Sequence, residues 1–253
     1  MFENKVAIIT GAASGIGLAV SKELKKSGAM LVMADVNSEK LKEEAEKIES
    51  DYFICDLSKR EECKALVDHT LDKTGKVNIL VNVAGVQTVS KIDAFPEDRW
   101  DFIISLMLSA PFYLTKYVWP SMKEQGWGRI INLSSIHGLV ASEYKSAYVA
   151  AKHGLMGLTK TTGLEGGPLG ITVNAICPAY VKTPLVDNQI AEQAETHGIS
   201  EEDVIKDIML VKSSIKKLIE PSEIAQIVKF LCSDAASGMT GSAIVVDGGW
   251  TAG

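Results

Sequence analysis

Residues 6–17 decide the fold, and they read Val6-Ala7-Ile8-Ile9-Thr10-Gly11-Ala12-Ala13-Ser14-Gly15-Ile16-Gly17. The first five are apolar or β-branched and predict a buried strand. From Ile16 to Ser27 apolar residues recur at helical spacing, and Gly28 provides a natural helix end. The glycines between the two segments follow the pattern G-x-x-x-G-x-G, so a glycine-rich loop joins a strand directly to a helix.

A glycine loop in this position is typical of a site that holds the pyrophosphate of a dinucleotide. Gly11 permits the tight turn, and Gly15 lets the backbone approach the pyrophosphate at the helix N-terminus. Gly17 lets the helix pack closely against the strand. The simpler alternative is a tight strand-to-helix turn without a ligand. A P-loop is excluded, because no Gly-Lys-Ser/Thr follows.

Carboxylates end the next two expected strands. Asp35 follows Gly17 by 18 residues, where a carboxylate can bind both ribose hydroxyls of NAD and would repel the 2′-phosphate of NADP. No lysine or arginine follows it immediately, so the sequence predicts NAD as the cofactor. Asp56 and Leu57 end the third strand, where an adenine would lie, although Asp56 could instead cap a helix. The fourth strand ends in Asn82-Val83-Ala84-Gly85, whose small residues allow a cofactor to lie against the backbone.

Strands and helices alternate along the rest of the chain. Strands are expected at 6–10, 31–34, 51–55, 77–83, 128–133, 171–176 and 243–246, and helices at 16–27, 39–49, 59–73, 97–123, 147–164 and 222–232. This order predicts an α/β fold with a doubly wound parallel sheet, the Rossmann fold, in three α/β/α layers. With no linker or repeat, residues 1–253 are expected to form a single domain. The polar stretch 184–217 interrupts the rhythm and is interpreted as a helical lid.

Composition excludes several classes of protein. The 253 residues are 46% hydrophobic and 23% charged, which is typical of a globular chain. A net charge of −6 argues against a nucleic-acid partner. No apolar run approaches the roughly 18 residues of a membrane span, and the N-terminus lacks a signal-peptide layout, so we expect a cytoplasmic protein without a membrane partner. The four cysteines and four histidines are scattered, so no metal site is expected.

A candidate proton-transfer set lies in the second half of the chain. Tyr148 and Lys152 are four residues apart and share a helix face. A nearby ammonium lowers a tyrosine pKa by about 1–3 units, so Lys152 is expected to make Tyr148 a usable general base. Ser135 closes the fifth strand, at the edge where open α/β sheets bind ligands, and its hydroxyl could hold a substrate oxygen. Ser135 could equally be a loop cap.

Together the glycine pattern, Asp35, the Asn82 stretch, Ser135 and Tyr148-x-x-x-Lys152 resemble the short-chain dehydrogenase/reductase family. The resemblance covers the whole chain, including Asn174-Ala175-Ile176-Cys177-Pro178 and Asp247-Gly248-Gly249. It implies a Rossmann-fold oxidoreductase, usually a homotetramer, with Ser135, Tyr148 and Lys152 as catalytic residues. It further implies that the cofactor contacts Thr10, Gly11, Ser14, Gly15, Ile16, Gly17, Asp35, Asp56, Leu57, Asn82, Ala84, Gly85, Tyr148, Lys152, Pro178, Val181 and Thr183.

Longer stretches, among them 127–132, 136–142 and 145–154, resemble the branch of the family that oxidises D-3-hydroxybutyrate to acetoacetate. That resemblance implies that the substrate contacts Gln87, Ser135, His137, Lys145, Tyr148, Tyr180 and Gln189. A small hydroxy acid carries one negative charge, and a cation with amide and imidazole donors is the set that a buried carboxylate requires. Taken singly, Lys145 and Gln189 could be ordinary surface residues, and His137 could be an ordinary loop histidine.

The sequence also departs from the family pattern. Met107 stands where an asparagine usually helps to hold a water beside the lysine, and a thioether cannot donate a hydrogen bond. Val83 replaces a second asparagine and Ala179 replaces a glycine. Tyr180 stands where the related branch has a tryptophan, and its ring could still cover a methyl group. Two alternatives therefore stay open: an NAD-dependent enzyme for another small hydroxy acid, or an NAD-binding protein with impaired catalysis.

Overall fold

Seven parallel strands form the centre of the molecule in the order β3-β2-β1-β4-β5-β6-β7. The computed structural model describes the backbone of residues 1–253 and every side chain except those of Glu192, Thr196 and His197. The strands are β1 Val6–Thr10, β2 Met30–Asp35, β3 Asp51–Ile54, β4 Ile79–Asn82, β5 Gly128–Leu133, β6 Ile171–Pro178 and β7 Ala243–Val246. The strand order reverses between β1 and β4, and the crevice at such a point binds ligands in open α/β sheets.

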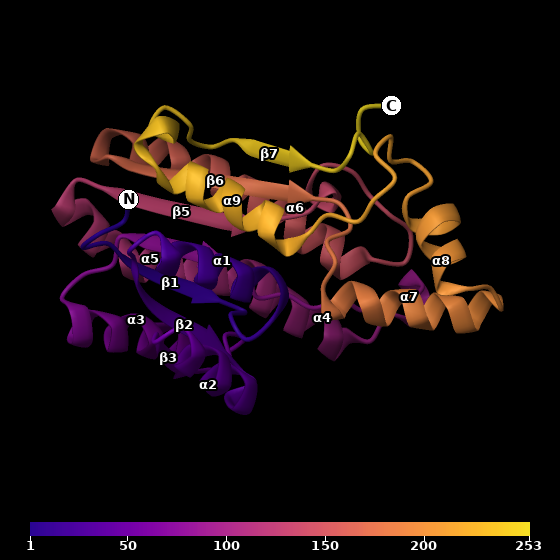
Figure 1. The fold of residues 1–253 in the computed structure, drawn as a ribbon, viewed down its shortest axis with the longest axis horizontal. Coiled ribbons are helices and arrows are strands. Elements are labelled where there is room, and N and C mark those ends of the chain that lie inside the picture. The colour runs from indigo at the N-terminus through magenta and orange to yellow at the C-terminus, as the bar shows by residue number, and fades with distance from the viewer.

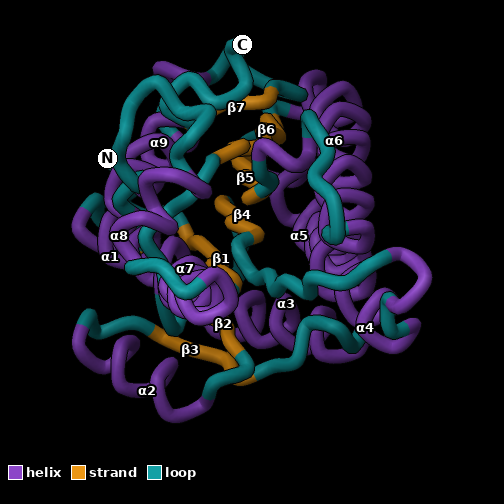
Figure 2. The backbone as a smooth tube through the Cα atoms, turned by 90° about the vertical axis from the view of Figure 1, so that its right-hand side faces the viewer, coloured by secondary structure: helices purple, strands orange, loops and turns teal.

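Helices cover both faces of this sheet. They are α1 Gly15–Lys26, α2 Ser38–Lys47, α3 Arg60–Thr74, α4 Glu97–Ile104, α5 Ala110–Gln125, α6 Ser146–Gly166, α7 Pro184–His197, α8 Glu201–Asp203 and α9 Pro221–Cys232. Helices α1, α2 and α9 pack on one face, and α3, α5 and α6 on the other (Figure 2). Helices α7 and α8 project beyond the carboxyl ends of the strands (Figure 1). The sheet and its layers confirm the doubly wound fold expected from the sequence.

The two faces of β1 explain why its sequence is apolar throughout. Ala7 and Ile9 face the core shared with α1 and α9, whereas Ile8 faces the core shared with α3 and α5. All five residues of β1 are buried, as are all residues of β4, β5 and β6. A strand covered on both sides must be apolar on both, so its hydrophobic residues run continuously instead of alternating.

Segment 184–217 is helical only in part. Helix α7 ends at Gly198, whose φ of +64° suits a left-handed helix cap. Helix α8 follows and continues as a π-helical turn, Val204–Met209, and residues 210–217 contain no helix. The sequence prediction of a helical segment is therefore right for most of 184–209 and wrong beyond it. Polar composition alone did not show where the helices stop.

The helix that runs from Glu97 to Gln125 through α4 and α5 is long and apolar enough to cross a membrane, judged by length and composition alone. Its residues Leu114, Val118 and Met122 are fully buried against the sheet. A buried core helix can pass the same test of length and composition, and 39% of the most apolar stretch of this helix is buried within the structure. A π-helical turn at Ser105–Ser109 links α4 to α5.

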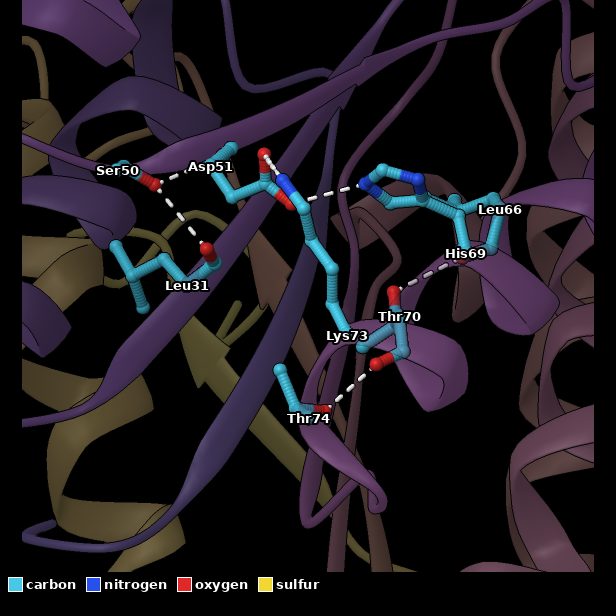
Figure 3. A network of polar contacts seen from close by, with 8 residues as sticks. All are labelled: Leu31, Ser50, Asp51, Leu66, His69, Thr70, Lys73 and Thr74. Carbon is cyan, nitrogen blue, oxygen red and sulfur yellow. Dashed lines mark hydrogen bonds and ion pairs between the residues drawn. The ribbon is translucent and has the colours of Figure 1, made fainter.

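The edge strand β3 is tied to helix α3 by polar contacts (Figure 3). The carboxylate of Asp51 lies 2.6 Å from the Lys73 ammonium and 2.9 Å from Nε2 of His69. Burial opposes ionisation of Asp51, but the bonds from Lys73 and His69 outweigh it, and the pKa of Asp51 is lowered. Because β3 has one strand neighbour only, these bonds help to hold it in register.

Candidate active site

The glycine loop between β1 and α1 is packed too tightly for side chains. A Cβ on Gly17 would lie 2.1 Å from the carbonyl oxygen of Gly11, so any larger residue would force α1 away from the loop. Gly11 has a φ of +63° and Gly15 one of +51°, a conformation that glycine adopts without strain. Thr10 ties the start of the loop to the end of β4, because its Oγ1 accepts hydrogen bonds from the backbone N–H groups of Val83 and Ala84. The loop therefore lies beside the end of β4, with the N-terminus of α1 facing outward.

A cleft of about 410 Å³ opens above this loop. Its lining includes Gly11, Ser14, Gly15, Ile16, Asp35, Val36, Cys55, Asp56, Leu57, Val83, Ala84, Gly85, Phe102, Leu106 and Thr183. The carboxylates of Asp35 and Asp56 are the only charged side chains on these walls, and the structure describes every side chain that lines them. Asp35 accepts hydrogen bonds from the N–H groups of Ala13 and Asn37, both at 3.0 Å. Backbone groups thus hold an acidic side chain at the wall of the cleft.

Three of the expected cofactor contacts line neither this cleft nor the cavity beside it. Thr10 and Gly17 support the loop from inside, as just described. The Asn82 side chain donates to Oδ1 of Asn132 at 2.8 Å and lies within the sheet. The remaining expected contacts line this cleft or the cavity beside it, and a glycine loop at the N-terminus of α1, with no room for a Cβ on Gly17, fits the pyrophosphate of a dinucleotide.

The neighbouring cavity, of about 130 Å³, brings the expected proton-transfer residues together. Ser135 lies just after β5, and Tyr148 and Lys152 lie in the first two turns of α6. All three line the cavity together with Pro178, Val181 and Thr183. Tyr148 and Lys152, four residues apart on α6, thus lie beside Ser135 at the end of β5, as the sequence predicted.

Helix α6 is fixed to the sheet by a buried chain of amides and hydroxyls. Asn132 on β5 accepts from Asn82 and donates at 2.9 Å to Oγ1 of Thr159, which in turn donates to the Leu155 carbonyl. Oγ of Ser134 also donates to the carbonyl of Lys152 at 3.4 Å. Because these groups are buried and paired, the contacts resist sliding of α6 along the sheet. They therefore position Tyr148 and Lys152 relative to Ser135.

The electrostatics of this pair differ from the sequence prediction. Burial raises the pKa of Tyr148, and a hydrogen bond from Ser135 opposes that rise. Burial also lowers the pKa of Lys152 to about 8, and its ammonium donates to the Leu133 carbonyl at 2.5 Å. The expected lowering of the Tyr148 pKa by Lys152 is therefore wrong for this geometry. Sequence spacing placed both groups on one face but could not show that the ammonium turns toward β5.

A third cavity, of about 60 Å³, adjoins Tyr148 and Ser135 and contains the expected substrate contacts. It is lined by Gln87, Ser135, Ile136, His137, Lys145, Tyr148, Ala179, Tyr180, Leu185, Val186 and Gln189. No acidic side chain occurs among these residues. Nε2 of Gln87 and Nδ1 of His137 are buried, and neither has a hydrogen-bond partner among the described residues.

The charge state of this cavity follows from burial. Burial and the neighbouring Lys145 lower the pKa of His137 to about 4, so its ring is neutral at pH 7. Burial also lowers the pKa of Lys145, and no carboxylate of the described residues forms an ion pair with it. A half-buried ammonium beside amides and a neutral imidazole forms a site for a small anion.

Met107 lies in the π-helical turn and is 1% exposed. Its side chain lines the same cavity as Tyr148 and Lys152, and its Cε is 3.4 Å from the position that a Cβ on Gly85 would take. The thioether packs with Ile103, Ala147 and Ala151 in a small apolar cluster. The departure seen in the sequence therefore places an apolar surface directly beside the proton-transfer residues.

Sequence reasoning missed several residues in and around the site, among them Leu185, Val186 and Trp250. Leu185 and Val186, at the start of α7, line both the second and the third cavity. The Trp250 ring packs edge-on against His137, with centroids 6.2 Å apart, and lies under the ammonium of Lys212. The two apolar residues carry no motif. Trp250 is 113 residues from His137 in the sequence, and only the position of the C-terminal segment after β7 brings them together.

Comparisons with known proteins bear on the whole chain. A family model described as enoyl-(acyl carrier protein) reductase matches residues 11–251. A D-beta-hydroxybutyrate dehydrogenase of Rhizobium meliloti is 47% identical over 98% of this chain and 99% of its own. A protein of the same name from Cupriavidus necator is 41% identical, with both chains fully covered. Among solved structures, a levodione reductase superposes with a TM-score of 0.92 at 31% identity, covering 100% of this chain and 99% of its own.

Proposed function

Because the chain belongs to the short-chain dehydrogenase/reductase family and is an oxidoreductase that uses a nicotinamide dinucleotide, we propose that it converts D-3-hydroxybutyrate and NAD to acetoacetate and NADH. The supporting observation is the third cavity, where Lys145 has no acidic partner and the polar atoms of Gln87 and His137 lack described partners. A carboxylate would satisfy all three groups at once. Two relatives named for hydroxybutyrate share more than two-fifths of the sequence.

NAD is proposed over NADP because of the charge at the cofactor cleft. The ribose nearest to the loop would meet the carboxylate of Asp35, which backbone N–H groups hold in place. A 2′-phosphate there would face Asp35 and Asp56, with no lysine or arginine on the described walls. The cleft thus repels an additional phosphate and accepts a pair of hydroxyl donors.

The residues of the two smaller cavities then have separate roles. We assign Lys145, His137, Gln87 and Gln189 to the substrate carboxylate, so that they fix which end of the molecule lies near Tyr148. Ser135 accepts a hydrogen bond from the backbone N–H of His137 at 3.1 Å and donates to Tyr148, so a substrate oxygen bound beside Tyr148 could take over this donated proton. The bound dinucleotide supplies the nicotinamide that exchanges a hydride with the substrate carbon.

Tyr148 is the proposed general base for the hydroxyl proton of the substrate. Burial favours its protonated form, which would donate a proton to the carbonyl oxygen in the reverse reduction of acetoacetate. In the oxidation Tyr148 would first lose its proton, and the tyrosinate would then accept the hydroxyl proton of the substrate. Lys152, anchored to Leu133, is assigned to the nicotinamide ribose. Leu185 and Val186 cover the cavities and exclude water during the transfer.

The test is a Lys145→Met variant, which keeps the length of the side chain and removes its charge. A charge-assisted hydrogen bond contributes about 1.5–3 kcal/mol, so kcat/KM for D-3-hydroxybutyrate should fall by roughly 10- to 150-fold. The KM for NAD should change less than about twofold, because Lys145 does not line the cofactor cleft.

A Lys123→Met variant is the matched control, since Lys123 is exposed at the end of α5. It should retain the kinetics of the parent protein with both substrates. If Lys145→Met changed the KM for NAD and for hydroxybutyrate equally, or changed neither, the carboxylate site would be wrongly assigned.

A further inference from the structure

Tyr144 adopts a backbone conformation that is unfavourable for its residue type. Its φ is +64°, in the left-handed region that glycine adopts freely and that is costly for a residue with a bulky side chain. Packing of the phenol ring does not account for this conformation, because Tyr144 is 51% exposed. Strained residues persist where the surrounding structure holds them, and they are concentrated at functional sites. Tyr144 directly precedes Lys145, the cation of the proposed carboxylate site.

Two hydrogen bonds hold the backbone on either side of Lys145. The carbonyl of Tyr144 accepts from the N–H of Ser90 at 2.9 Å. The carbonyl of Lys145 accepts from the N–H of Val149 at 2.8 Å, in the first turn of α6, which also carries Tyr148. The planar peptide groups before and after Lys145 are therefore both anchored, and the direction in which its side chain leaves the backbone is set by them.

Ser90 belongs to a segment that presents Gln87 to the same cavity. This segment, 83–91, follows β4 and contains no helix or strand. Arg99 on α4 anchors it, because Nε and Nη2 of its guanidinium donate to Oγ1 of Thr88, both at 3.3 Å. The bond from Ser90 ties the same segment to the chain just before α6. One backbone bond thus joins the two stretches that supply an amide and an ammonium to the cavity.

Backbone placement matters for Lys145 because no ion pair holds its side chain. The ammonium has no carboxylate partner among the described residues. A charge-assisted hydrogen bond to a substrate carboxylate requires a distance of about 2.7–2.9 Å, so a displacement of the Lys145 backbone by about 1 Å would weaken it.

The left-handed conformation of Tyr144 is what allows both anchoring bonds at once. A negative φ at this residue would change the course of the chain, and the Tyr144 carbonyl would turn away from Ser90 while α6 still held Lys145. Resting on the proposed function, we infer that Tyr144 is a positioning residue for substrate binding. Its strained backbone and the bond from Ser90 fix Lys145 beside Gln87, where both meet the substrate carboxylate.

The experiment changes the backbone preference at Tyr144. Tyr144→Val introduces a β-branched side chain, which strongly disfavours a φ of +64°, whereas Tyr144→Gly adopts this φ without strain. Tyr144→Val should lower kcat/KM for D-3-hydroxybutyrate about tenfold, close to the loss of one charge-assisted bond. Tyr144→Gly should retain the parental value within about twofold. The KM for NAD should change by less than about twofold in both variants, because neither Tyr144 nor Lys145 lines the cofactor cleft.

A double variant tests whether Tyr144 acts through the ammonium. With Lys145→Met already present, Tyr144→Val should lower kcat/KM by less than about a further twofold, because the contact that it disturbs is gone. Asn4→Val is the matched control, since Asn4 also has a φ of +64° but precedes β1 and lines none of the three cavities. It should lower the melting temperature and leave kcat/KM unchanged. If Tyr144→Val did not fold, Tyr144→Ala would replace it, because it differs from Tyr144→Gly only in its Cβ.

The outcomes separate this inference from the function on which it rests. The inference would fail if Tyr144→Val retained the parental kcat/KM, or if Tyr144→Gly lost as much as Tyr144→Val. It would also fail if the loss persisted beside Lys145→Met, or if the KM for NAD rose equally. In these cases Lys145→Met alone would still lower kcat/KM for hydroxybutyrate, and the proposed function would stand. If Lys145→Met alone had no effect, or if the parent protein did not oxidise hydroxybutyrate, the proposed function would fail and the inference with it.

Discussion

Removing the charge of Asp35 should change which dinucleotide the protein uses. Asp35→Asn keeps a side-chain oxygen that can accept from the N–H groups of Ala13 or Asn37, so the loop should keep its shape. The substitution removes a negative charge from the cofactor cleft and leaves Asp56 as the only charged group on its walls. Asp35→Asn should therefore weaken the preference for NAD over NADP without a large structural change.

Two contributions determine how far Asp35→Asn should change the ratio of kcat/KM for NADP to that for NAD. Hydrogen bonds from ribose hydroxyls to a charged acceptor contribute about 1.5–3 kcal/mol, and with NAD most of this is lost. At 4 Å and an effective dielectric constant of 20, a unit charge repels a phosphate by about 4 kcal/mol, and solvent at this half-exposed site reduces that to about 1–2 kcal/mol. With NADP this repulsion is relieved. Together these make about 2.5–5 kcal/mol, so at about 1.4 kcal/mol per tenfold change the ratio of kcat/KM for NADP to that for NAD should rise roughly 60- to 4,000-fold.

The assay follows reduced nicotinamide at 340 nm with each dinucleotide at saturating hydroxy acid. Asp72→Asn serves as the control, because Asp72 is exposed on α3 and does not line the cleft. A fall in kcat/KM by the same factor for NAD and NADP would refute the reasoning, since it would show that Asp35 only supports the loop. An unchanged ratio would mean that the ribose does not meet this carboxylate.

Two further substitutions test the packing around the site and the edge of the sheet. Met107→Asn places an amide among Ile103, Ala147 and Ala151, where it is buried without hydrogen-bond partners. The free energy of unfolding should therefore fall by about 1–3 kcal/mol, which a lower melting temperature would show. An unchanged melting temperature would mean that the cavity provides hydrogen-bond partners for the amide. Asp51→Asn should destabilise the protein by about 1 kcal/mol at pH 7, measured by urea unfolding. Because the folded-state pKa of Asp51 is lowered, this contribution is present above the unfolded pKa of about 3.9 and is lost as pH falls through the folded value. A difference that persisted with equal size at pH 2 would contradict this origin.

Much of the fold could be predicted because its central strands are covered on both faces. Runs such as 6–10 and 31–34, which consist of apolar or β-branched residues throughout, have no other simple explanation, and the structure has strands there. The segments outside the central strands were harder to predict from the sequence. Helix α7 ends at Gly198, and the segment 210–217 is held by contacts that no local pattern encodes, such as the bonds from Ser214 and Ile215 to the carbonyl of Gly248.

The candidate site shows the same division between local and tertiary information. Spacing along one helix was enough to place Tyr148 and Lys152 together, and the glycine pattern was enough to place the loop. The direction of the Lys152 ammonium depends on the Leu133 carbonyl, and therefore on how α6 packs against β5. Likewise Trp250 reaches His137 only because the chain turns back after β7. Contacts between distant segments were beyond the reach of periodicity and motif.

The proposed activity is the oxidation of a small 3-hydroxy acid that the protein recognises by its carboxylate. The most direct measurement compares NADH formation at 340 nm from D-3-hydroxybutyrate with that from D-3-hydroxybutyramide, which differs only in its uncharged amide. The acid is expected to turn over, and kcat/KM for the amide should be at least about tenfold lower, because Lys145 would then face no charge. Equal kcat/KM values for the two compounds would contradict it, as would tight NADH binding without turnover of either.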